Sequence, residues 1–311
     1  MRVLISGQRV DWDEYGGLLQ AALTDSGIEA EVIHERMPRS PETVDYIVYA
    51  PWSDMKDFSP FTGAKAVLNL WAGVESVIGN ETLTAPLARM VDPGLTDGMV
   101  EWCVAHAMRH HLGIDRDVCR RDAVWDPYVP PLARDRPLTI LGLGVLGRAV
   151  GEALSGLGFP VTGWSRSVKD VSGMTCHSGE GGLVEALGRA ELLLLLLPLT
   201  PATEEIMNAE RLALLPKGAV LINPGRGPLI DDDALLAALD SGHIAHATLD
   251  VFREEPLPGD HPFWAHPGIT VTPHIASATR PDTAVGVIVE NIRRGEAGEP
   301  LLHLVDRRLG Y

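Results

Sequence analysis

Three groups of polar residues each follow a short run of aliphatic and β-branched residues. Arg226 lies in the turn after "AVLIN", Glu254 and Glu255 lie after "ATLDVF", and His274 comes directly after "ITVTP". Such runs predict strands, and the carboxyl ends of parallel strands border one ligand crevice. There a histidine could transfer a proton, a carboxylate could orient it, and a guanidinium could stabilise developing negative charge. The spacing therefore makes His274 a candidate proton donor.

A separate group of residues predicts a dinucleotide site. Gly142, Gly144 and Gly147 form GxGxxG between the strand "LTIL" and a helical apolar stripe that begins with Val145 and Leu146. In this motif the first glycine permits a tight turn, the second lets the backbone approach a pyrophosphate, and the third lets helix and strand pack closely. The start of the helix then offers N–H groups to the diphosphate.

The end of the next strand, "PVTGW", indicates which dinucleotide binds. An NAD site has an acidic residue there that binds the ribose diol. This chain has Trp164, Ser165, Arg166 and Ser167, and no carboxylate precedes Asp170. An arginine and two hydroxyl groups suit a phosphate on the ribose. The sequence therefore predicts NADP(H) rather than NAD(H).

The elements that must position these residues alternate between apolar runs and helical patterns, which predicts an α/β protein. With 311 residues the chain is long enough for two domains. We expect helices over 13–27 and 96–113, and a second α/β series from Leu138 to about Pro281. Between them lies a charged, Pro-rich connector at 114–137. A last helix near the C-terminus could return to the first domain.

Composition excludes some classes of partner. The formal net charge of −16 argues against nucleic acid and anionic membranes as partners. The run "ELLLLLLPL" at 191–199 is too short for a membrane helix and predicts a strand buried on both faces. Three widely spaced cysteines, Cys103, Cys119 and Cys176, fit reduced thiols in a cytoplasmic protein.

Two clusters could suggest a metal, but we expect none. His106, His110 and His111 lie on one predicted helix without an HExxH motif or a set of carboxylates, so packing and surface exposure explain them better. The aspartates at 231–233 open a predicted helix, where capping and first-turn charge account for them.

Taken in order, these motifs resemble the D-isomer-specific 2-hydroxyacid dehydrogenase family. That family has a glycine-rich nucleotide turn, an "N-x-x-R-G" turn, a "D-V-F-x-x-E-P-L" turn and a "P-H" at a strand end, and this sequence contains all four. The segments "GVLG", "GFP", "WSRS", "LLAALDSG", "TRP" and "VDRRLGY" are similar to the glyoxylate/hydroxypyruvate reductase A group of the family. The resemblance covers nearly the whole chain.

The resemblance implies a fold and a reaction. The fold would comprise two Rossmann-like or flavodoxin-like domains, with doubly wound parallel sheets and a cleft between them. Residues 1–101 plus 282–311 would form the substrate-binding domain, and residues 102–281 the dinucleotide-binding Rossmann domain. The activity would be NADPH-dependent reduction of a small 2-oxoacid to the D-2-hydroxyacid in a cytoplasmic homodimer, with the connector at 114–137 as a dimer arm.

The resemblance also implies roles for individual residues. Arg226 would bind the 2-oxoacid, His274 would donate the proton, and Glu255 rather than Glu254 would hydrogen-bond the imidazole. The substrate would further contact Trp52 and the N–H groups of Ala72 and Gly73. The cofactor would contact residues of the glycine turn, of the ribose-binding strand end and of three further loops: Gly142, Gly144, Val145, Leu146, Gly147, Trp164, Ser165, Arg166, Ser167, Leu197, Pro198, Thr203, Pro224, Asp250 and His274.

Two departures and two alternatives accompany the resemblance. Trp71 stands where the family has a small residue, which affects the size of the pocket, and "NPGRG" places Pro224 and Gly225 where other residues are usual.

One alternative function is a dinucleotide-sensing, corepressor-like scaffold with little turnover. The other is a dehydrogenase of a larger D-2-hydroxyacid.

Overall fold

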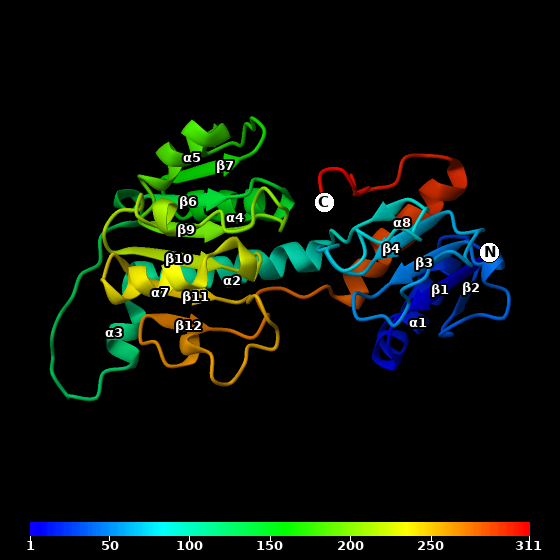
Figure 1. Cartoon of the computed structure of the whole chain (residues 1–311), viewed down its shortest axis with the longest axis horizontal. Helices are drawn as coiled ribbons and strands as arrows, with labels where there is room; N and C mark the ends of the chain where they lie inside the picture. Colours follow the sequence, from blue (N-terminus) through cyan, green and yellow to red (C-terminus); the bar gives the residue numbers. More distant parts are fainter. The chain divides into compact units, whose positions relative to one another are not determined.

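A computed structural model describes all residues, 1–311, and divides the chain into two compact units. The first unit consists of Met1–Leu95 and Ala278–Tyr311, and the second of Thr96–Ser277. Each unit contains one sheet in which neighbouring strands run parallel (Figure 1). Apolar clusters cover both faces of each sheet. The predicted α/β class with two parallel sheets is therefore confirmed.

The first unit has five strands in the order β2-β1-β3-β4-β5. Their bounds are β1 (Arg2–Ser6), β2 (Glu31–Ile33), β3 (Tyr46–Tyr49), β4 (Ala66–Asn69) and β5 (Leu87–Ala88). Helices α1 (Arg9–Asp25) and α8 (Pro281–Ala297) pack against each other and share one apolar cluster with the sheet. Helix α1 begins four residues before the predicted start, because the Asp11 carboxylate accepts a hydrogen bond from the Gln8 N–H and so caps the first turn.

The second unit has seven strands in the order β12-β11-β10-β9-β6-β7-β8, which can be followed upward in Figure 1 as far as β7. Their bounds are β6 (Leu138–Leu141), β7 (Val161–Ser165), β8 (Met174–Ser178), β9 (Leu192–Leu195), β10 (Ala219–Asn223), β11 (Ile244–Leu249) and β12 (Ile269–Val271). All four leucines of β9 are fully buried at the centre of this sheet. The run at 191–199 therefore contains a strand buried on both faces, as predicted.

The helices of the second unit follow most of the predicted pattern. They are α2 (Pro93–Leu112), which begins in the first unit, α3 (Ile114–Val118), α4 (Val145–Gly156), α5 (Gly179–Leu187), α6 (Ala209–Leu212) and α7 (Asp232–Asp240). The predicted helix over 96–113 is α2, which starts earlier because Pro93 suits its first turn. No helix of the chain combines the length and the apolar character needed to cross a membrane.

One residue from each of the two polar clusters, His110 and Asp231, makes a structural contact. His110 Nε2 lies 2.8 Å from Thr248 Oγ1, and its ring centroid lies 4.9 Å from that of His246. Burial is the main reason that the pKa of His110 falls to about 3, so this imidazole is neutral. Asp231 Oδ1 accepts a hydrogen bond of 3.0 Å from the Ala234 N–H and caps α7.

Candidate active site

The turns that carry Arg226, Glu255 and His274 follow three neighbouring strands of the second unit. These strands, β10, β11 and β12, are adjacent and parallel, so their carboxyl ends lie at one edge of the sheet. The parallel pairing thus brings together three segments that are far apart in the sequence. This is the arrangement that the sequence pattern predicted for the candidate proton donor and its neighbours.

His274 and Glu255 form the central contact of this edge. His274 Nδ1 lies 2.7 Å from Glu255 Oε2, and both side chains are about one-third exposed, at 35% and 34%. Glu255 Oε1 accepts a second hydrogen bond, of 2.8 Å, from the Phe252 N–H. Burial alone would raise the pKa of Glu255, but the hydrogen bonds from His274 and Phe252 outweigh it and lower this pKa. Glu255 is therefore a charged partner for the imidazole at neutral pH.

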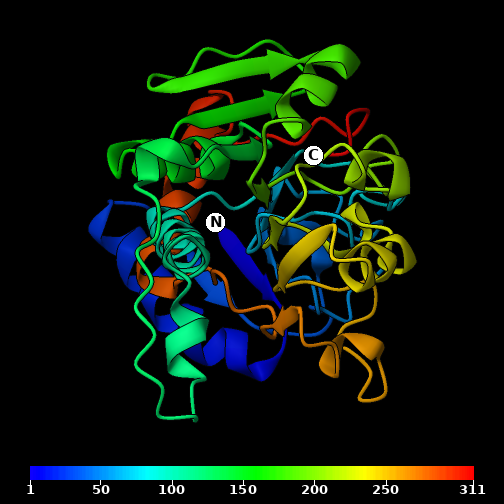
Figure 2. The same cartoon turned by 90° about the vertical axis from the view of Figure 1, so that its left-hand side faces the viewer.

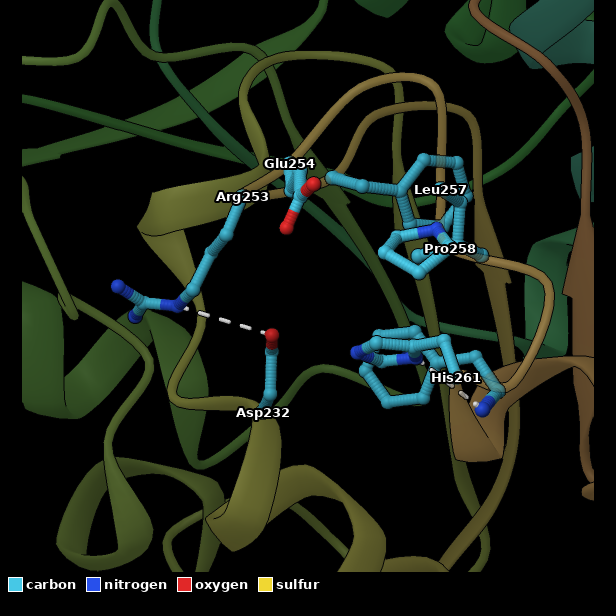
Figure 3. A pocket seen from close by; sticks show the side chains of 8 residues that line it. Asp232, Arg253, Glu254, Leu257, Pro258 and His261 are labelled. Atoms are coloured by element: carbon cyan, nitrogen blue, oxygen red, sulfur yellow. Dashed lines mark hydrogen bonds and ion pairs between the residues drawn. The ribbon is translucent and has the colours of Figure 1, made fainter.

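Glu254, the other carboxylate of this turn, lies in a different environment. It lines a pocket of about 190 Å³ together with the side chains of Asp232, Phe252, Arg253, Leu257, Pro258, His261 and Phe263 (Figure 3). In this pocket Arg253 Nε lies 3.7 Å from Asp232 Oδ2, and Arg253 Nη2 donates a hydrogen bond of 2.9 Å to Glu205 Oε1. The structure thus pairs His274 with Glu255 and leaves Glu254 beside a network of surface charges.

The backbone at His274 is held in an unusual conformation. His274 has a φ of +52°, and its N–H donates to the Asp250 carbonyl at 2.8 Å. The Asp250 carboxylate is fully buried and accepts bonds from Thr272 Oγ1, Ile275 N and Ala276 N at 2.6, 2.9 and 2.8 Å. These bonds fix the loop that presents the imidazole. The expected contact of Asp250 with the cofactor stays a prediction beside this observed structural role.

Arg226 is presented by a turn that an asparagine braces. Asn223, the last residue of β10, is fully buried, and its Nδ2 donates to the Arg226 carbonyl at 2.9 Å. Its Oδ1 accepts from the Gly225 N–H at 3.0 Å. Sequence reasoning included Asn223 in the "N-x-x-R-G" motif but missed its bracing role. Its position as an asparagine at a strand end before a glycine-containing turn was the available signal, since amide side chains commonly bond to the backbone of such turns.

The glycine-rich turn between β6 and α4 has the geometry that a pyrophosphate site requires. Gly142 has a φ of +109°, a conformation that favours glycine, and its N–H donates to the Trp164 carbonyl at 2.8 Å. A Cβ at Gly147 would meet the Gly142 carbonyl oxygen at 1.7 Å, whereas Gly144 faces open space. A tight turn, a close helix–strand approach and an open helix start at Val145 therefore coincide, and this cradle fits a dinucleotide.

The strand β7 leads to the predicted ribose site beside this turn. Ser165 Oγ donates to the Ser167 carbonyl at 2.7 Å, and Arg166 and Ser167 are exposed. Trp164 is instead buried, with its Nε1 donating to the Gly179 carbonyl at 2.9 Å. The loop after β9 contains Leu197, which is buried, Pro198 and Thr203, whose hydroxyl donates to the Pro198 carbonyl at 2.7 Å. Pro224 lies between Asn223 and the Arg226 turn.

The predicted carboxylate-binding turn belongs to the first unit. It follows β4 and contains Ala72 and Gly73. Asn69, the buried last residue of β4, donates through Nδ2 to the carbonyls of Trp71 and Gly73, at 2.7 Å each. This one amide therefore holds two carbonyls of the turn in place. Asn69 was also missed from the sequence, and it occupies the same kind of position as Asn223.

Comparison with known proteins agrees with this geometry. Residues 102–276, more than half of the chain, match the model of the family described as D-isomer specific 2-hydroxyacid dehydrogenase, NAD binding domain. The chain therefore belongs to the D-isomer-specific 2-hydroxyacid dehydrogenase family, and it is an oxidoreductase. The resemblance seen in the sequence is confirmed.

Individual relatives are similar over most of their length. The glyoxylate/hydroxypyruvate reductase A of Yersinia enterocolitica is 40% identical over 79% of this chain and 82% of its own length. The protein of the same name from Photorhabdus laumondii is 40% identical over 86% of this chain and 88% of its own length.

Solved structures are similar over the whole chain. A D-isomer specific 2-hydroxyacid dehydrogenase from Xanthobacter autotrophicus, in complex with NADPH and MES, is 40% identical with a TM-score of 0.92. That alignment covers 100% of this chain and 99% of the other. The NADPH-dependent glyoxylate/hydroxypyruvate reductase of Sinorhizobium meliloti, in complex with NADP and sulfate, is 34% identical with a TM-score of 0.88. This alignment also covers 100% of this chain and 99% of the other.

Proposed function

We propose that this chain is an NADPH-dependent reductase that converts a small 2-oxoacid of the glyoxylate or hydroxypyruvate type into the D-2-hydroxyacid. The observation that carries the proposal is the 2.7 Å contact between His274 and Glu255, at the carboxyl edge of a sheet that also bears the dinucleotide turn. The names and ligands of the similar proteins support the same cofactor and substrate class.

In our proposal, the glycine turn, Arg226 and His274 each have a separate role in the reaction. NADPH supplies the hydride when it is bound at the turn of Gly142, Gly144 and Gly147. The Arg226 guanidinium binds the 2-oxoacid and stabilises the negative charge that develops on its carbonyl oxygen. His274 donates the proton to that oxygen, and because Nδ1 faces Glu255, Nε2 is the nitrogen that delivers it.

The remaining contacts of the proposal hold the ligands. The N–H groups of Ala72 and Gly73 bind the carboxylate of the substrate, and Trp52 lies beside them in the same unit. Residues 1–101 plus 282–311 would serve substrate binding and residues 102–281 dinucleotide binding. The three cysteines are free thiols, which supports a cytoplasmic location.

A substrate panel tests the function directly. NADPH absorbance is followed with glyoxylate, hydroxypyruvate, pyruvate and phenylpyruvate, and the product is analysed on a chiral column. We expect rapid consumption with one or more of the short 2-oxoacids, and a D-product wherever the product is chiral. If NADPH binds but none of the four acids is reduced, a scaffold with little turnover would replace the proposal. A preference for phenylpyruvate would indicate a dehydrogenase that acts on a larger D-2-hydroxyacid.

Replacing Arg166 by alanine tests the choice of cofactor. In our proposal the Arg166 guanidinium binds the 2′-phosphate of NADPH, and a charge-assisted pair of this kind contributes about 1.5–3 kcal/mol. We expect KM for NADPH to rise about 10- to 100-fold while KM for NADH changes little. Lys169→Ala removes a second cation of the same loop and serves as the control. A clear preference for NADH in the unaltered enzyme would contradict the assignment.

Replacing Glu255 by glutamine tests the partner of the proton donor. The lowered pKa of Glu255 keeps this carboxylate charged at neutral pH, and its 2.7 Å contact with Nδ1 of His274 leaves Nε2 as the nitrogen that faces the substrate in our proposal. Glutamine keeps the size of the side chain but lacks the charge, so it holds the imidazole less firmly in that orientation. We therefore expect kcat for reduction to fall about 10- to 100-fold, less than the loss of the proton donor itself would cause, with NADPH affinity nearly unchanged. An unchanged kcat, with Glu254→Gln causing the loss instead, would transfer the role to Glu254.

We also propose that the chain forms a homodimer through the connector at 114–137, here called the arm. Most of the arm extends away from the sheet of its own unit (Figures 1 and 2). Several of its apolar side chains are exposed, with Trp125 at 95% and Val129 at 88%. Exposed apolar patches of this kind commonly mark protein interfaces. Sedimentation equilibrium is expected to give the mass of a dimer, with dissociation in Trp125→Ser; a monomer across the working concentrations would contradict this.

A further inference from the structure

Two tryptophans of the first unit form a pair beside the predicted carboxylate-binding turn. Trp52 lies in the loop after β3 and Trp71 in the loop after β4, and these strands are neighbours in the sheet. Their ring centroids are 4.9 Å apart, and the planes cross at 74°, which is the edge-to-face geometry that aromatic rings favour. We call these two side chains the aromatic wall.

A buried carboxylate fixes one side of this wall. Trp52 Nε1 donates to Asp11 Oδ2 at 2.6 Å, and Asp11 is only 2% exposed. The same oxygen accepts from the Gln8 N–H at 2.6 Å, in the first turn of α1. The indole of Trp52 is therefore attached to the segment that follows β1, and its polar atom is directed towards Asp11. With 39% of the residue exposed, Trp52 still presents surface to solvent.

The other side of the wall is fixed to the carboxylate-binding turn itself. Trp71 directly precedes Ala72, and its carbonyl accepts bonds from Asn69 Nδ2 at 2.7 Å and from the Met90 N–H at 3.0 Å. The backbone that holds the Trp71 ring is thus the backbone that would hold the substrate anion. A large ring at this position occupies space that a glycine would leave open.

From these contacts we infer that the aromatic wall sets an upper limit on the side chain of the 2-oxoacid. Glyoxylate, which has no carbon beyond its carbonyl, fits beside the wall, whereas the ring of phenylpyruvate meets it. Asp11 is a positioning residue, because its bond prevents the Trp52 indole from turning aside to admit a longer side chain. The inference rests on the proposed function and specifies the substrate class of the same site.

The test measures kcat/KM for glyoxylate and phenylpyruvate in the full-length enzyme with saturating NADPH. The readout is the ratio of the two constants. We expect Trp71→Gly and Trp52→Ala each to lower the ratio about 10- to 100-fold, chiefly by a gain with phenylpyruvate, since a mismatch of even one methylene in a pocket has effects of this size. Trp12→Phe is the matched control, because Trp12 stacks on His34 in the same unit, with centroids 5.7 Å apart, and we expect its ratio to stay at the wild-type value.

Trp52→Phe isolates the part played by Asp11. Phenylalanine retains a ring but has no N–H, so the bond to Asp11 is lost while the bond from Gln8 that caps α1 remains. We expect a ratio between those of the wild type and Trp52→Ala. A wild-type ratio in Trp52→Phe would show that Asp11 does not position the wall.

The other outcomes are equally decisive. An unchanged ratio in both Trp71→Gly and Trp52→Ala, or a loss of phenylpyruvate turnover in either, would overturn the wall while leaving the glyoxylate reductase intact. If the wild type reduces neither glyoxylate nor phenylpyruvate, calorimetric titration of both acids into the NADPH complex tests the wall instead, and the proposed function itself fails only if hydroxypyruvate and pyruvate are not reduced either. Tighter binding of phenylpyruvate by the two variants would support the wall, and equal or weaker binding would overturn it.

Discussion

Removing the imidazole in His274→Ala is expected to lower kcat for 2-oxoacid reduction about a thousandfold, since a positioned general acid contributes about 10²–10⁴. The dissociation constant of NADPH should change less than about threefold, because the glycine turn and the Arg166 loop supply most of that binding. Single-turnover kinetics with saturating NADPH would measure the loss in the chemical step, and fluorescence titration would measure cofactor affinity.

His266→Ala is the matched control for this experiment. His266 also pairs with a carboxylate, with Nε2 at 3.3 Å from Asp240 Oδ1, but it precedes β12 whereas His274 follows it. It therefore lies at the opposite end of the same strand. We expect near wild-type kcat for His266→Ala. Equal activities of the two variants would show that His274 is not the proton donor.

Replacing the guanidinium in Arg226→Ala is expected to lower kcat/KM for the 2-oxoacid about a thousandfold, because the loss of one donor to a developing oxyanion has effects of about 10²–10³ in kcat and binding is lost in addition. Both kcat and KM should change, since Arg226 would contact the substrate before and during hydride transfer. Initial-rate kinetics over a wide range of 2-oxoacid concentration separate the two constants.

Two further variants define what Arg226 contributes. Arg226→Lys keeps the charge but loses the planar fork of donors, so a partial recovery of about tenfold over alanine is expected. Arg253→Ala removes a guanidinium from the neighbouring turn, where it bonds to Glu205 at 2.9 Å, and should change stability more than kcat/KM. A wild-type KM and kcat in Arg226→Ala would exclude the proposed oxyanion contact.

Particular residues show how much of the fold could be predicted from the sequence. The glycine spacing at 142–147, the buried strand β9 and the cap at Asp231 were all predicted, because each depends on residues close together in the chain. The strands β5 and β8 had no comparable signal. β5 has only two residues, and β8 is a half-exposed edge strand of mixed polarity. Neither strand therefore shows a clear alternation of apolar and polar residues.

The candidate site could be predicted only in part. Its strand-end turns follow from local patterns, and the family resemblance assigned roles to Arg226, Glu255 and His274. The bracing roles of Asn69 and Asn223 were missed because an asparagine at a strand end has many possible partners.

By itself, the sequence determined the family, the parallel α/β architecture and the segments at which we propose that ligands bind. These properties depend on short-range spacing, which the order of residues specifies directly. The family resemblance already implied the contact of Glu255 with His274, but tertiary structure alone decided that Thr272 meets Asp250 and that Asp11 meets Trp52. These two pairs join residues 22 and 41 positions apart, and strand order and register bring them within hydrogen-bond distance.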